Sequence, residues 1–403
     1  MELMEHSASP LNRKFWTPGV LVMLVFMMAG AICIIARFTG GIGYVTNLTN
    51  ARPWGLWVGV DVATGVALAA GGFTTAALAH IAGKHLYEPV TRPALLTAAL
   101  GYTFVVLGLL VDIGRSWAIW KPIFNWNTNS VLFEVAMCVM VYLHVLYFEF
   151  FPIIAEQFKG RVNLPGFGSA FNGLVEMILK VGDAIIGKIM WIFIILGVVL
   201  SCMHQSSLGS LMLVAPTKLH PLWYTPILPL LFLTSAVAVG YPMVVFETTL
   251  VTASFKLDSE MNILAPLTRI TIFLLGIYLF LKCGDMVYRG TYVYLLDGTY
   301  QTNSFIVEML FGIMVPWVML LFERVRNSRR GVFIAASLIV FGVVINRINV
   351  FIVGYKSPLS ANGYFPALTE ILVTLGLIAT LMFIYRFVVT YLPVLQAPKE
   401  VSS

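Results

Sequence analysis

Ten long apolar runs constrain this chain more than any other feature of its sequence. Each approaches the roughly 17 to 25 residues that a helix needs to cross the hydrocarbon core of a bilayer. Of the 403 residues, 59% are apolar and only 11% are charged, which excludes a soluble fold. The sequence therefore predicts an all-α integral membrane protein, a bundle of ten transmembrane helices. The runs are residues 19–36, 57–82, 94–111, 131–155, 182–201, 227–255, 267–281, 305–322, 331–353 and 368–392.

An even number of spans places both termini on one side of the membrane. The loops on that side carry the larger share of Lys and Arg, above all Arg324, Arg326, Arg329 and Arg330, so the positive-inside rule predicts that both termini are cytoplasmic. The first run lacks a small-residue cleavage site, and we expect a retained helix. We predict a cytoplasmic tail of residues 1–15, a membrane domain of residues 16–395 and a second cytoplasmic tail of residues 396–403. The net charge of +6 is mostly this loop bias and does not indicate nucleic-acid binding.

Ionisable residues interrupt the apolar runs near one predicted surface, the side opposite the termini. Such residues are costly in hydrocarbon and usually mark an ion, proton or ligand path. Their clustering at one depth predicts a site. Asp112 and Arg115 are three residues apart and share a helix face, so the simpler alternative for these two is a local ion pair. The cluster consists of Asp61, Asp112, Arg115, Glu134, His204 and Arg347.

Titrating carboxylates beside an Arg and a His suit a ligand that exchanges protons, and a quinone is such a ligand. Its two carbonyls take up two electrons and two protons, and its isoprenoid tail lies in lipid. We expect His204 or Glu134 to donate a hydrogen bond to one carbonyl and to pass it a proton. We expect Arg115 to stabilise negative charge on the quinone oxygens. The predicted catalytic residues are therefore Glu134, His204 and Arg115.

A stripe of polar residues continues from this cluster towards the cytoplasm. Glu134, Cys138, Tyr142 and Glu149 lie on one face of the fourth span at 100° per residue, and His144 lies on another face. Chains of acids and His in membranes often relay protons. We hypothesise a path through Tyr142, His144, Glu149, Asp183 and Glu247. Near the headgroups the alternative is local pairing of Lys180 with Glu176 or Asp183.

No cofactor-binding pattern is evident. A haem between helices needs two His at matching depth; only His204 and His220 share a level, and His220 precedes Pro221 in a predicted loop. The four cysteines show no C-x-x-C pair and no His/Cys ligand spacing. We therefore expect no haem and no metal bound by this chain. Without a redox cofactor of its own, it depends on a partner for electrons.

Several sequence blocks resemble the polysulfide reductase membrane-subunit (NrfD/PsrC) family. The resemblance covers nearly the whole chain and is greatest to the ten-helix branch, which holds the HybB membrane subunit of an uptake hydrogenase and the QrcD subunit of a quinone reductase complex. The blocks are 53–55 with Trp57 and Asp61, 92–96, 112–115, 129–134, 203–207 with 209–211, 220–223 and 246–247.

The resemblance implies a haem-free, multi-pass subunit of the bacterial inner membrane that binds menaquinone or a related quinone near the periplasm. It implies a periplasmic iron–sulfur subunit as electron donor, and a catalytic subunit that is a hydrogenase, a molybdopterin-type enzyme or a multihaem cytochrome c. Family members are thought to couple quinone chemistry to proton uptake from the cytoplasm, although the proton-path residues differ among branches. The implied quinone-binding set is Trp57, Asp61, Asp112, Arg115, Glu134 and His204.

Two other functions compete with this interpretation. A secondary transporter would bind a solute near the bilayer midplane between inverted repeats, whereas here the charges gather towards one surface and no repeat is evident. A pure membrane anchor without a quinone site would not need acids such as Asp61 and Glu134 within its spans, because each costs insertion energy. Solute uptake by the chain alone would favour the first alternative, and full quinone-linked activity after neutralising both acids would favour the second.

Overall fold

The computed structural model describes residues 8–11, 13–214, 216–257, 260–357 and 363–395. Within these ranges, ten helical segments are long and apolar enough to cross a membrane, as predicted. Helices suit lipid because they satisfy every backbone N–H and C=O internally. Extended backbone pairs in two isolated β-bridges, Thr49 with Arg52 and Leu219 with Tyr355.

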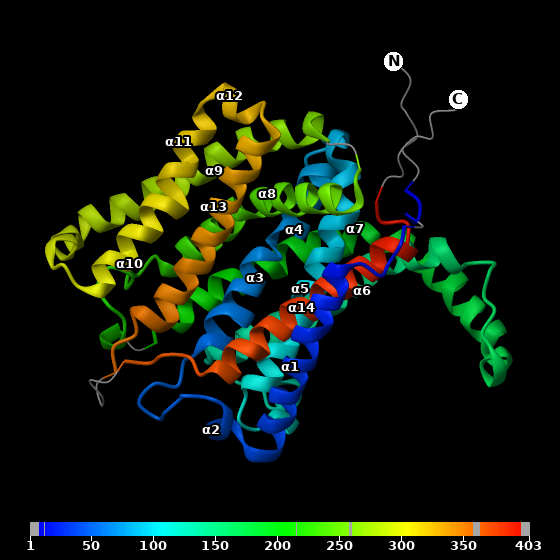
Figure 1. Ribbon diagram of the computed structural model, residues 1–403, viewed down its shortest axis with the longest axis horizontal. Coiled ribbons are helices and arrows are strands. Elements are labelled where there is room, and N and C mark those ends of the chain that lie inside the picture. Colours follow the sequence, from blue (N-terminus) through cyan, green and yellow to red (C-terminus); the bar gives the residue numbers. More distant parts are fainter. Residues whose placement is uncertain (1–7, 12, 215, 258–259, 358–362, 396–403) are drawn as a thin grey trace.

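The spans follow one another up and down (Figure 1). In chain order they are α1 (Pro18–Gly40); η1 (Trp57–Thr64), α3 (Gly65–Leu68), α4 (Ala70–Ala76) and η2 (Ala77–Ile81) as one span; η3 (His85–Tyr87) with α5 (Glu88–Asp112); α6 (Val131–Phe158); η6 (Gly166–Phe171) with α7 (Asn172–Leu211); α8 (Leu228–Phe255); α9 (Met261–Tyr288); α10 (Tyr300–Met309), η9 (Leu310–Met314) and α11 (Val315–Leu321) as one span; α13 (Arg329–Ile348) with η10 (Asn349–Val353); and α14 (Leu368–Tyr391). Short helices in the connections are α2 (Ile42–Val45), η4 (Ser116–Ala118), η5 (Lys121–Ile123), η7 (Pro216–Lys218), η8 (Thr291–Leu296) and α12 (Glu323–Arg326).

The two ends of the bundle differ. We call the end that carries the connections 41–56, 113–130, 212–227, 289–299 and 354–367 the outer end, and the opposite end the inner end. The first and last described segments meet at the inner end, where the Ser9 N–H donates to the Leu395 carbonyl at 3.2 Å. Helices α1 and α14 lie side by side along their length (Figure 1). The first and last described segments therefore lie at the same end of the bundle, as an even number of spans predicts.

The second span forms the centre of the bundle. Of the 18 residues in its apolar stretch, 78% are buried, whereas the corresponding share in α1 is 17%. Glycines permit this close packing: a Cβ on Gly72 would lie 3.2 Å from the Ala94 carbonyl oxygen, and one on Gly71 would lie 3.2 Å from the Gly240 carbonyl oxygen. The two glycines thus allow α5 and α8 to approach the central span closely.

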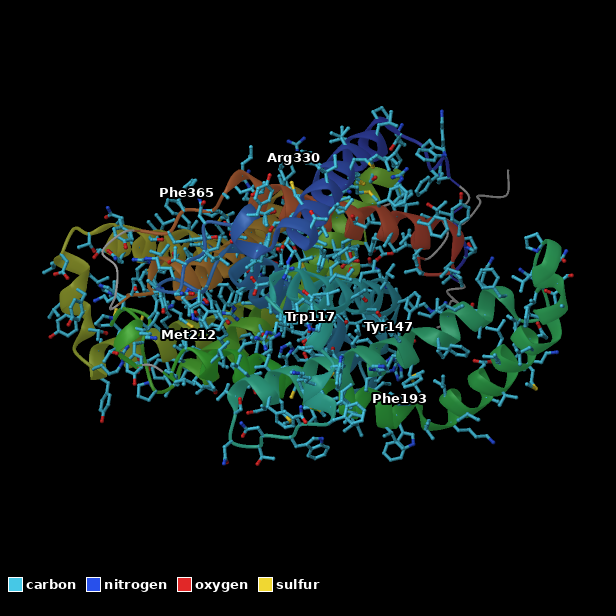
Figure 2. All side chains as sticks on the ribbon, turned by 90° about the horizontal axis from the view of Figure 1, so that it is seen from below. Trp117, Tyr147, Phe193, Met212, Arg330 and Phe365 are labelled. Carbon is cyan, nitrogen blue, oxygen red and sulfur yellow. The ribbon has the colours of Figure 1, made fainter. Side chains whose placement is uncertain are left out.

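Helix α7 is longer than a membrane span. Its 40 residues extend about 60 Å at 1.5 Å per residue, twice the roughly 30 Å of hydrocarbon. The inner ends of α6 and α7 project together from the body of the bundle, beyond the level of Phe193 (Figure 2). Ion pairs hold this projection, with Lys159 Nζ 2.8 Å from Asp183 Oδ2 and Lys180 Nζ 3.0 Å from Glu176 Oε1. The predicted Glu176–Lys180 local pair is thus confirmed, whereas Asp183 pairs with Lys159 instead of Lys180.

Candidate functional site

Asp61 lies on a π-helical segment, η1, at the outer half of the central span. The Thr374 hydroxyl of α14 donates to Asp61 Oδ2 at 2.8 Å. Gly108 of α5 packs directly against Asp61, because a Cβ there would lie 3.0 Å from the Asp61 Cβ. π-Helical segments often occur at functional sites. The carboxylate is therefore held between three helices.

Asp112 ends α5 close to Asp61 and interacts electrostatically with Asp61, Glu370 and Arg37. Trp57 is buried beside this group, and its indole N–H donates to the Glu370 carbonyl at 3.1 Å. The structure thus brings three of the predicted residues, Trp57, Asp61 and Asp112, to one place at the outer end of the bundle.

Arg37 of α1 belongs to this cluster and was not predicted. It is buried, with Nε 2.6 Å from the Val111 carbonyl and Nη2 2.5 Å from the Ile113 carbonyl. These bonds satisfy carbonyls at the C-terminal end of α5, where a cation is favoured. In the sequence, Arg37 looks like an ordinary loop cation at the end of an apolar run. Its burial follows from the position of α1 beside the outer end of α5, for which the sequence gives no signal.

The alternative of a local Asp112–Arg115 pair does not hold in the described part of the chain. Helix α5 ends at Asp112, and Ile113 is extended with φ −64° and ψ 124°. Arg115 therefore lies outside the helix, so the three-residue spacing does not place the two side chains on one face. Arg115 is exposed at the outer end, and Asp112 faces the guanidinium of Arg37.

Glu134 and Ser207 join α6 to α7. Glu134 lies in the first turn of α6, which Ser130 caps through a 3.4 Å bond from the Phe133 N–H. The Ser207 hydroxyl donates to Glu134 Oε1 at 2.6 Å. Ser207 is buried, whereas the Glu134 residue remains exposed on one side. Glu134 is thus anchored and still accessible, as a proton-exchanging group must be.

His204 lies one turn before Ser207 on α7 and has no exposed surface. Its Nδ1 lies 3.1 Å from the Tyr102 hydroxyl of α5, and its Nε2 is buried without a hydrogen-bond partner. Gln205 Oε1 is buried and unpartnered in the same way, and the Ser201 side chain interacts with Tyr102 and Tyr142. The spacing of these three residues places them on one face of α7. Unpaired buried polar atoms are rare and call for an explanation, of which a ligand or a catalytic role is one.

Tyr102 connects His204 to the stripe on α6. Its ring meets the Tyr142 ring edge-on at 4.5 Å between centroids. Tyr142 and Glu149 both face Gly197 of α7, where a Cβ would lie 3.5 Å from Tyr142 Cε2 and 3.1 Å from Glu149 Oε1. The structure thus aligns His204, Tyr102, Tyr142 and Glu149 along the α5–α6–α7 interface.

The other predicted proton-path residues lie elsewhere. His144 is exposed on α6, and its Nδ1 contacts the Met140 carbonyl at 2.7 Å. Asp183 pairs with Lys159 in the projecting hairpin. Glu247 of α8 accepts a 2.6 Å bond from the Tyr385 hydroxyl of α14. The structure does not bring these three residues together with Tyr142 and Glu149.

Arg347 lies at the outer half of the bundle but in a different polar cluster. Its guanidinium lies 3.7 Å from the centroid of the Phe232 ring, and Nη2 donates to Ser235 Oγ at 2.9 Å. It interacts electrostatically with Tyr278 and Glu308. The expected depth of Arg347 thus agrees with the structure, and α13 presents its side chain to residues of α8, α9 and α10.

The described residues offer no cluster of three or more His, Cys, Asp or Glu arranged for a metal ion. The four cysteines are free thiols. The two imidazoles predicted at one level lie apart in the packing: His204 contacts Tyr102, and the His220 ring meets Trp223 and Tyr294.

A bundle of ten membrane-crossing helices with buried acids and bases defines a multi-pass membrane protein with a polar interior. The family model described as "Polysulphide reductase, NrfD" matches residues 44–358. The chain belongs to the NrfD family. The predicted family is thereby confirmed.

The chain is similar over nearly its whole length to proteins named as subunits of redox enzymes. It is 31% identical to the probable Ni/Fe-hydrogenase 2 b-type cytochrome subunit of Escherichia coli, over 98% of this chain and 97% of the relative. It is 26% identical to the integral membrane subunit of menaquinone reductase from Nitratidesulfovibrio vulgaris, over 96% and 93%. It is 24% identical to one of the subunits of selenate reductase from Mesobacillus selenatarsenatis, over 95% of each chain. These relatives belong to redox complexes, so a redox role in such a complex is supported.

Proposed function

We propose that this chain is the quinone-reactive membrane subunit of a respiratory oxidoreductase complex and reduces menaquinone or a related quinone at its outer end. The observation that carries the proposal is the fully buried imidazole of His204, whose Nδ1 contacts Tyr102 and whose Nε2 has no partner in the described chain. A quinone carbonyl is an acceptor that a protonated ring nitrogen can satisfy. The relative named menaquinone reductase supports the choice of quinone.

The residues around His204 fit such a ligand. Gln205 is fixed by a 2.8 Å bond from Nε2 to the Val66 carbonyl, which leaves its Oε1 free of partners. Glu134 is anchored on Ser207 one turn further out. We expect His204 to bind and orient the quinone head and Glu134 to exchange the protons that reduction consumes. A bound quinone supplies the capacity to accept two electrons and two protons.

Asp61 and Asp112 form the neighbouring wall, joined to His204 through α5, which carries Tyr102, Gly108 and Asp112. Arg37 balances Asp112 in place of Arg115. We propose that Arg115, which is exposed at the outer end, contacts the electron-donating partner where that partner binds this chain. The proton path that fits the packing runs from Glu134 and His204 through Tyr102 and Tyr142 to Glu149.

The position in the cell follows from the same proposal. We propose that the outer end faces the periplasm and that both termini are cytoplasmic, in the bacterial inner membrane. A periplasmic iron–sulfur subunit would then deliver electrons at the outer connections from a hydrogenase, a molybdopterin-type enzyme or a multihaem cytochrome c. The names of the hydrogenase, menaquinone reductase and selenate reductase relatives support a multi-subunit complex of this kind.

The direct test is a fluorescence-quench titration of the purified complex with a quinone-analogue inhibitor. We expect His204→Ala to weaken binding at least about 10-fold, because a hydrogen bond in a buried site is worth about 1–3 kcal/mol when its loss leaves a partner unsatisfied. The matched control is His85→Ala at the inner end, where the side chain is 78% exposed; it should bind as the wild type does. Equal affinity in the His204 variant would place the quinone elsewhere.

We further expect the purified chain to carry no haem. One relative is named a b-type cytochrome subunit, yet the imidazoles of His204 and His220 contact different helices in this structure. Replacing His204 or His220 should therefore leave any b-type haem band in the reduced-minus-oxidised optical spectrum of the complex unchanged. A band lost in both variants would assign a haem to this chain and contradict the expectation.

A further inference from the structure

A second buried polar network occupies the outer half of the bundle between α8, α9, α10 and α13. At its centre Lys282 Nζ lies 2.6 Å from Glu308 Oε1, and the two residues are only 6% and 1% exposed. Asn346 Nδ2 also donates to Oε1 at 2.8 Å. Trp223 Nε1 and Asn349 Nδ2 donate to Oε2 at 2.9 and 2.8 Å.

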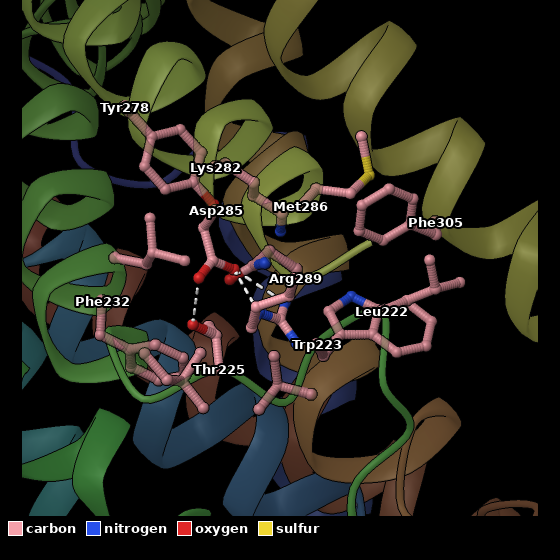
Figure 3. Close-up of a pocket in the computed structure, with 14 residues that line it drawn as sticks. Leu222, Trp223, Thr225, Phe232, Tyr278, Lys282, Asp285, Met286, Arg289 and Phe305 are labelled. Atoms are coloured by element: carbon pink, nitrogen blue, oxygen red, sulfur yellow. Dashed lines mark hydrogen bonds and ion pairs between the residues drawn. The ribbon is translucent and has the colours of Figure 1, made fainter. Parts of the chain in front are cut away.

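Two small cavities border this ion pair from opposite sides. The outer cavity is lined by Lys282, Tyr278 and Asn346, and near the outer end by Asp285 and Arg289 (Figure 3). The inner cavity is lined by Glu308, again by Tyr278 and Asn346, and then by Leu275 and Gly312 deeper in the bundle. Each offers about 10 Å³ to the centre of a water molecule. That is near the minimum for one water, and the polar lining supplies its partners. Neither cavity is lined by Asp61, Glu134 or His204.

The outer cavity leads towards the outer surface. Asp285 and Arg289 lie at the end of α9, with Arg289 Nη2 2.7 Å from Asp285 Oδ2. Thr225 of the outer connection donates to Asp285 Oδ1 at 2.7 Å, and these contacts are visible as dashed lines in Figure 3. The inner cavity ends among apolar residues and the close-packed Gly312 and Gly342. The charged lining therefore continues towards the outer end of the bundle, whereas the inner cavity is lined mainly by apolar residues.

Two helix distortions flank the ion pair. The π-helical segment η9 begins two residues after Glu308, and η10 begins at Asn349 itself. The Asn349 side chain is held in turn by Ser304 Oγ, 2.6 Å from its Oδ1. Such segments widen a helix locally and often occur at functional sites. An ion pair that only held the helices together would need neither these distortions nor the two cavities. Well-packed apolar residues hold helices together at a lower desolvation cost.

We propose that Lys282 and Glu308 form a proton-exchange site at the base of a water-lined half-channel that opens to the outer aqueous phase. In the loading step, a proton passes from hydronium through the cavity water to Glu308. An O–H bond forms at the carboxylate, an O–H bond of hydronium breaks, and water remains. Lys282 keeps its own proton and loses its counter-charge. Asp285, three residues further along α9, is the next carboxylate on that face and the group towards which the ammonium turns.

The charged and titratable groups that face the pair are few. Among the described residues they are Tyr278, Cys283, Asp285 and Arg289 from α9 and Arg347 from α13. Helix α8 contributes Phe232 and Ser235, which do not titrate. His220 of the outer connection contacts Trp223. Burial and, to a lesser degree, the Lys356 ammonium lower the pKa of His220 to about 4, so it is uncharged near neutral pH. The site is separate from the proposed quinone site and does not depend on it.

The test is infrared difference spectroscopy on the complex reconstituted in lipid vesicles with the outer end facing outwards. A pH step applied outside should change a protonated-carboxyl band, and this signal should be absent in Glu308→Gln. The single substitution leaves Lys282 buried without a counter-charge and is liable to misfold. The double variant Lys282→Met/Glu308→Gln removes both charges and keeps the volume, so it should fold, assemble and lack the band.

The matched control is the surface ion pair of the projecting hairpin. Glu176→Gln/Lys180→Met removes an equal and opposite pair of charges and should retain the Glu308 band. A wild-type complex without a band that depends on Glu308 would overturn the proposal, and so would a band that responds only to a pH step inside the vesicle. Because no quinone is added, failure here is distinguishable from failure of the proposed function, which the inhibitor titration tests.

Discussion

Replacing Glu134 by glutamine should lower the kcat of quinone reduction by about 100-fold, the lower end of what a positioned general acid or base contributes. Glutamine keeps the shape of the side chain and still accepts the bond from the Ser207 hydroxyl, which measures 2.6 Å in the wild-type protein. It cannot take up or release a proton near neutral pH. The loss should therefore appear in kcat and in the linked proton uptake, while the affinity for a quinone analogue changes little.

Ser207→Ala is the matched control for this experiment. It removes the hydrogen bond but leaves the carboxylate, so kcat should fall by about 10-fold, the lower end of what one lost hydrogen bond to a charged group costs. Stopped-flow oxidation of the purified complex by a soluble quinone analogue, with a pH indicator in weak buffer, reports both turnover and proton uptake. If Glu134→Gln took up protons at the wild-type rate, Glu134 would have no part in the transfer.

The number of spans and their approximate positions could be predicted from hydropathy alone, because the bilayer imposes a similar length on every span. The central span was expected at residues 57–82 and is Trp57–Ile81. The fifth span was expected at residues 182–201, whereas α7 is Asn172–Leu211. The charges at Glu176 and Lys180 shortened the expected span at its inner end. They are tolerated in the structure because the helix continues beyond the apolar slab and the two side chains pair with each other. Asp183, inside the expected span, pairs with Lys159, which follows α6.

Depth could be predicted for the polar residues, but lateral position could not. His204, Glu134, Asp61 and Arg347 all lie towards the outer end of the bundle, as expected, yet Arg347 contacts a different set of residues, on α8, α9 and α10. Residues at equal depth on different helices meet only if those helices are neighbours. In a ten-helix bundle, loop lengths and hydropathy do not fix the neighbours. The packing of α14 against α1 and η1, which brings Thr374 to Asp61, has no local signal in the sequence.

The Lys282–Glu308 pair shows the converse case. Each residue lies near the outer end of an apolar run, where a charge reads as an ordinary interfacial residue. Only the structure reveals that both are buried and that Asn346, Asn349 and Trp223 also donate to the Glu308 carboxylate. A usable signal was present in the amides, since Asn346 and Asn349 lie three apart in an apolar run and share a helix face. Neutral amides inside apolar runs are thus as informative as charged residues when a buried polar site is predicted from a sequence.

Substituting Gly342 by alanine should destabilise the protein by about 3 kcal/mol, the upper part of the range for overpacked cores. Helices α10–α11 and α13 cross at Gly312 and Gly342, and a Cβ on Gly342 would lie 2.8 Å from the Gly312 carbonyl oxygen and 2.9 Å from its carbonyl carbon. Carbon atoms normally approach to about 3.5–4.0 Å. The obstructing atoms are backbone, so no side-chain rotation relieves the overlap. The two helices must separate along their contact.

Gly284→Ala in α9 isolates this steric effect. Gly284 is also helical, but a Cβ there meets nothing within 4 Å, so alanine should be neutral or stabilising by up to about 1 kcal/mol through its better helix propensity. Heating the detergent-solubilised variants and measuring the fraction that stays monodisperse should show a lower Tm for Gly342→Ala and an equal or higher one for Gly284→Ala. Because Gly312 and Gly342 also line the inner cavity beside Glu308, separation of these helices should disturb that site before it disturbs Glu134 and His204. Equal melting of the two alanine variants would show that the helices do not cross at these glycines.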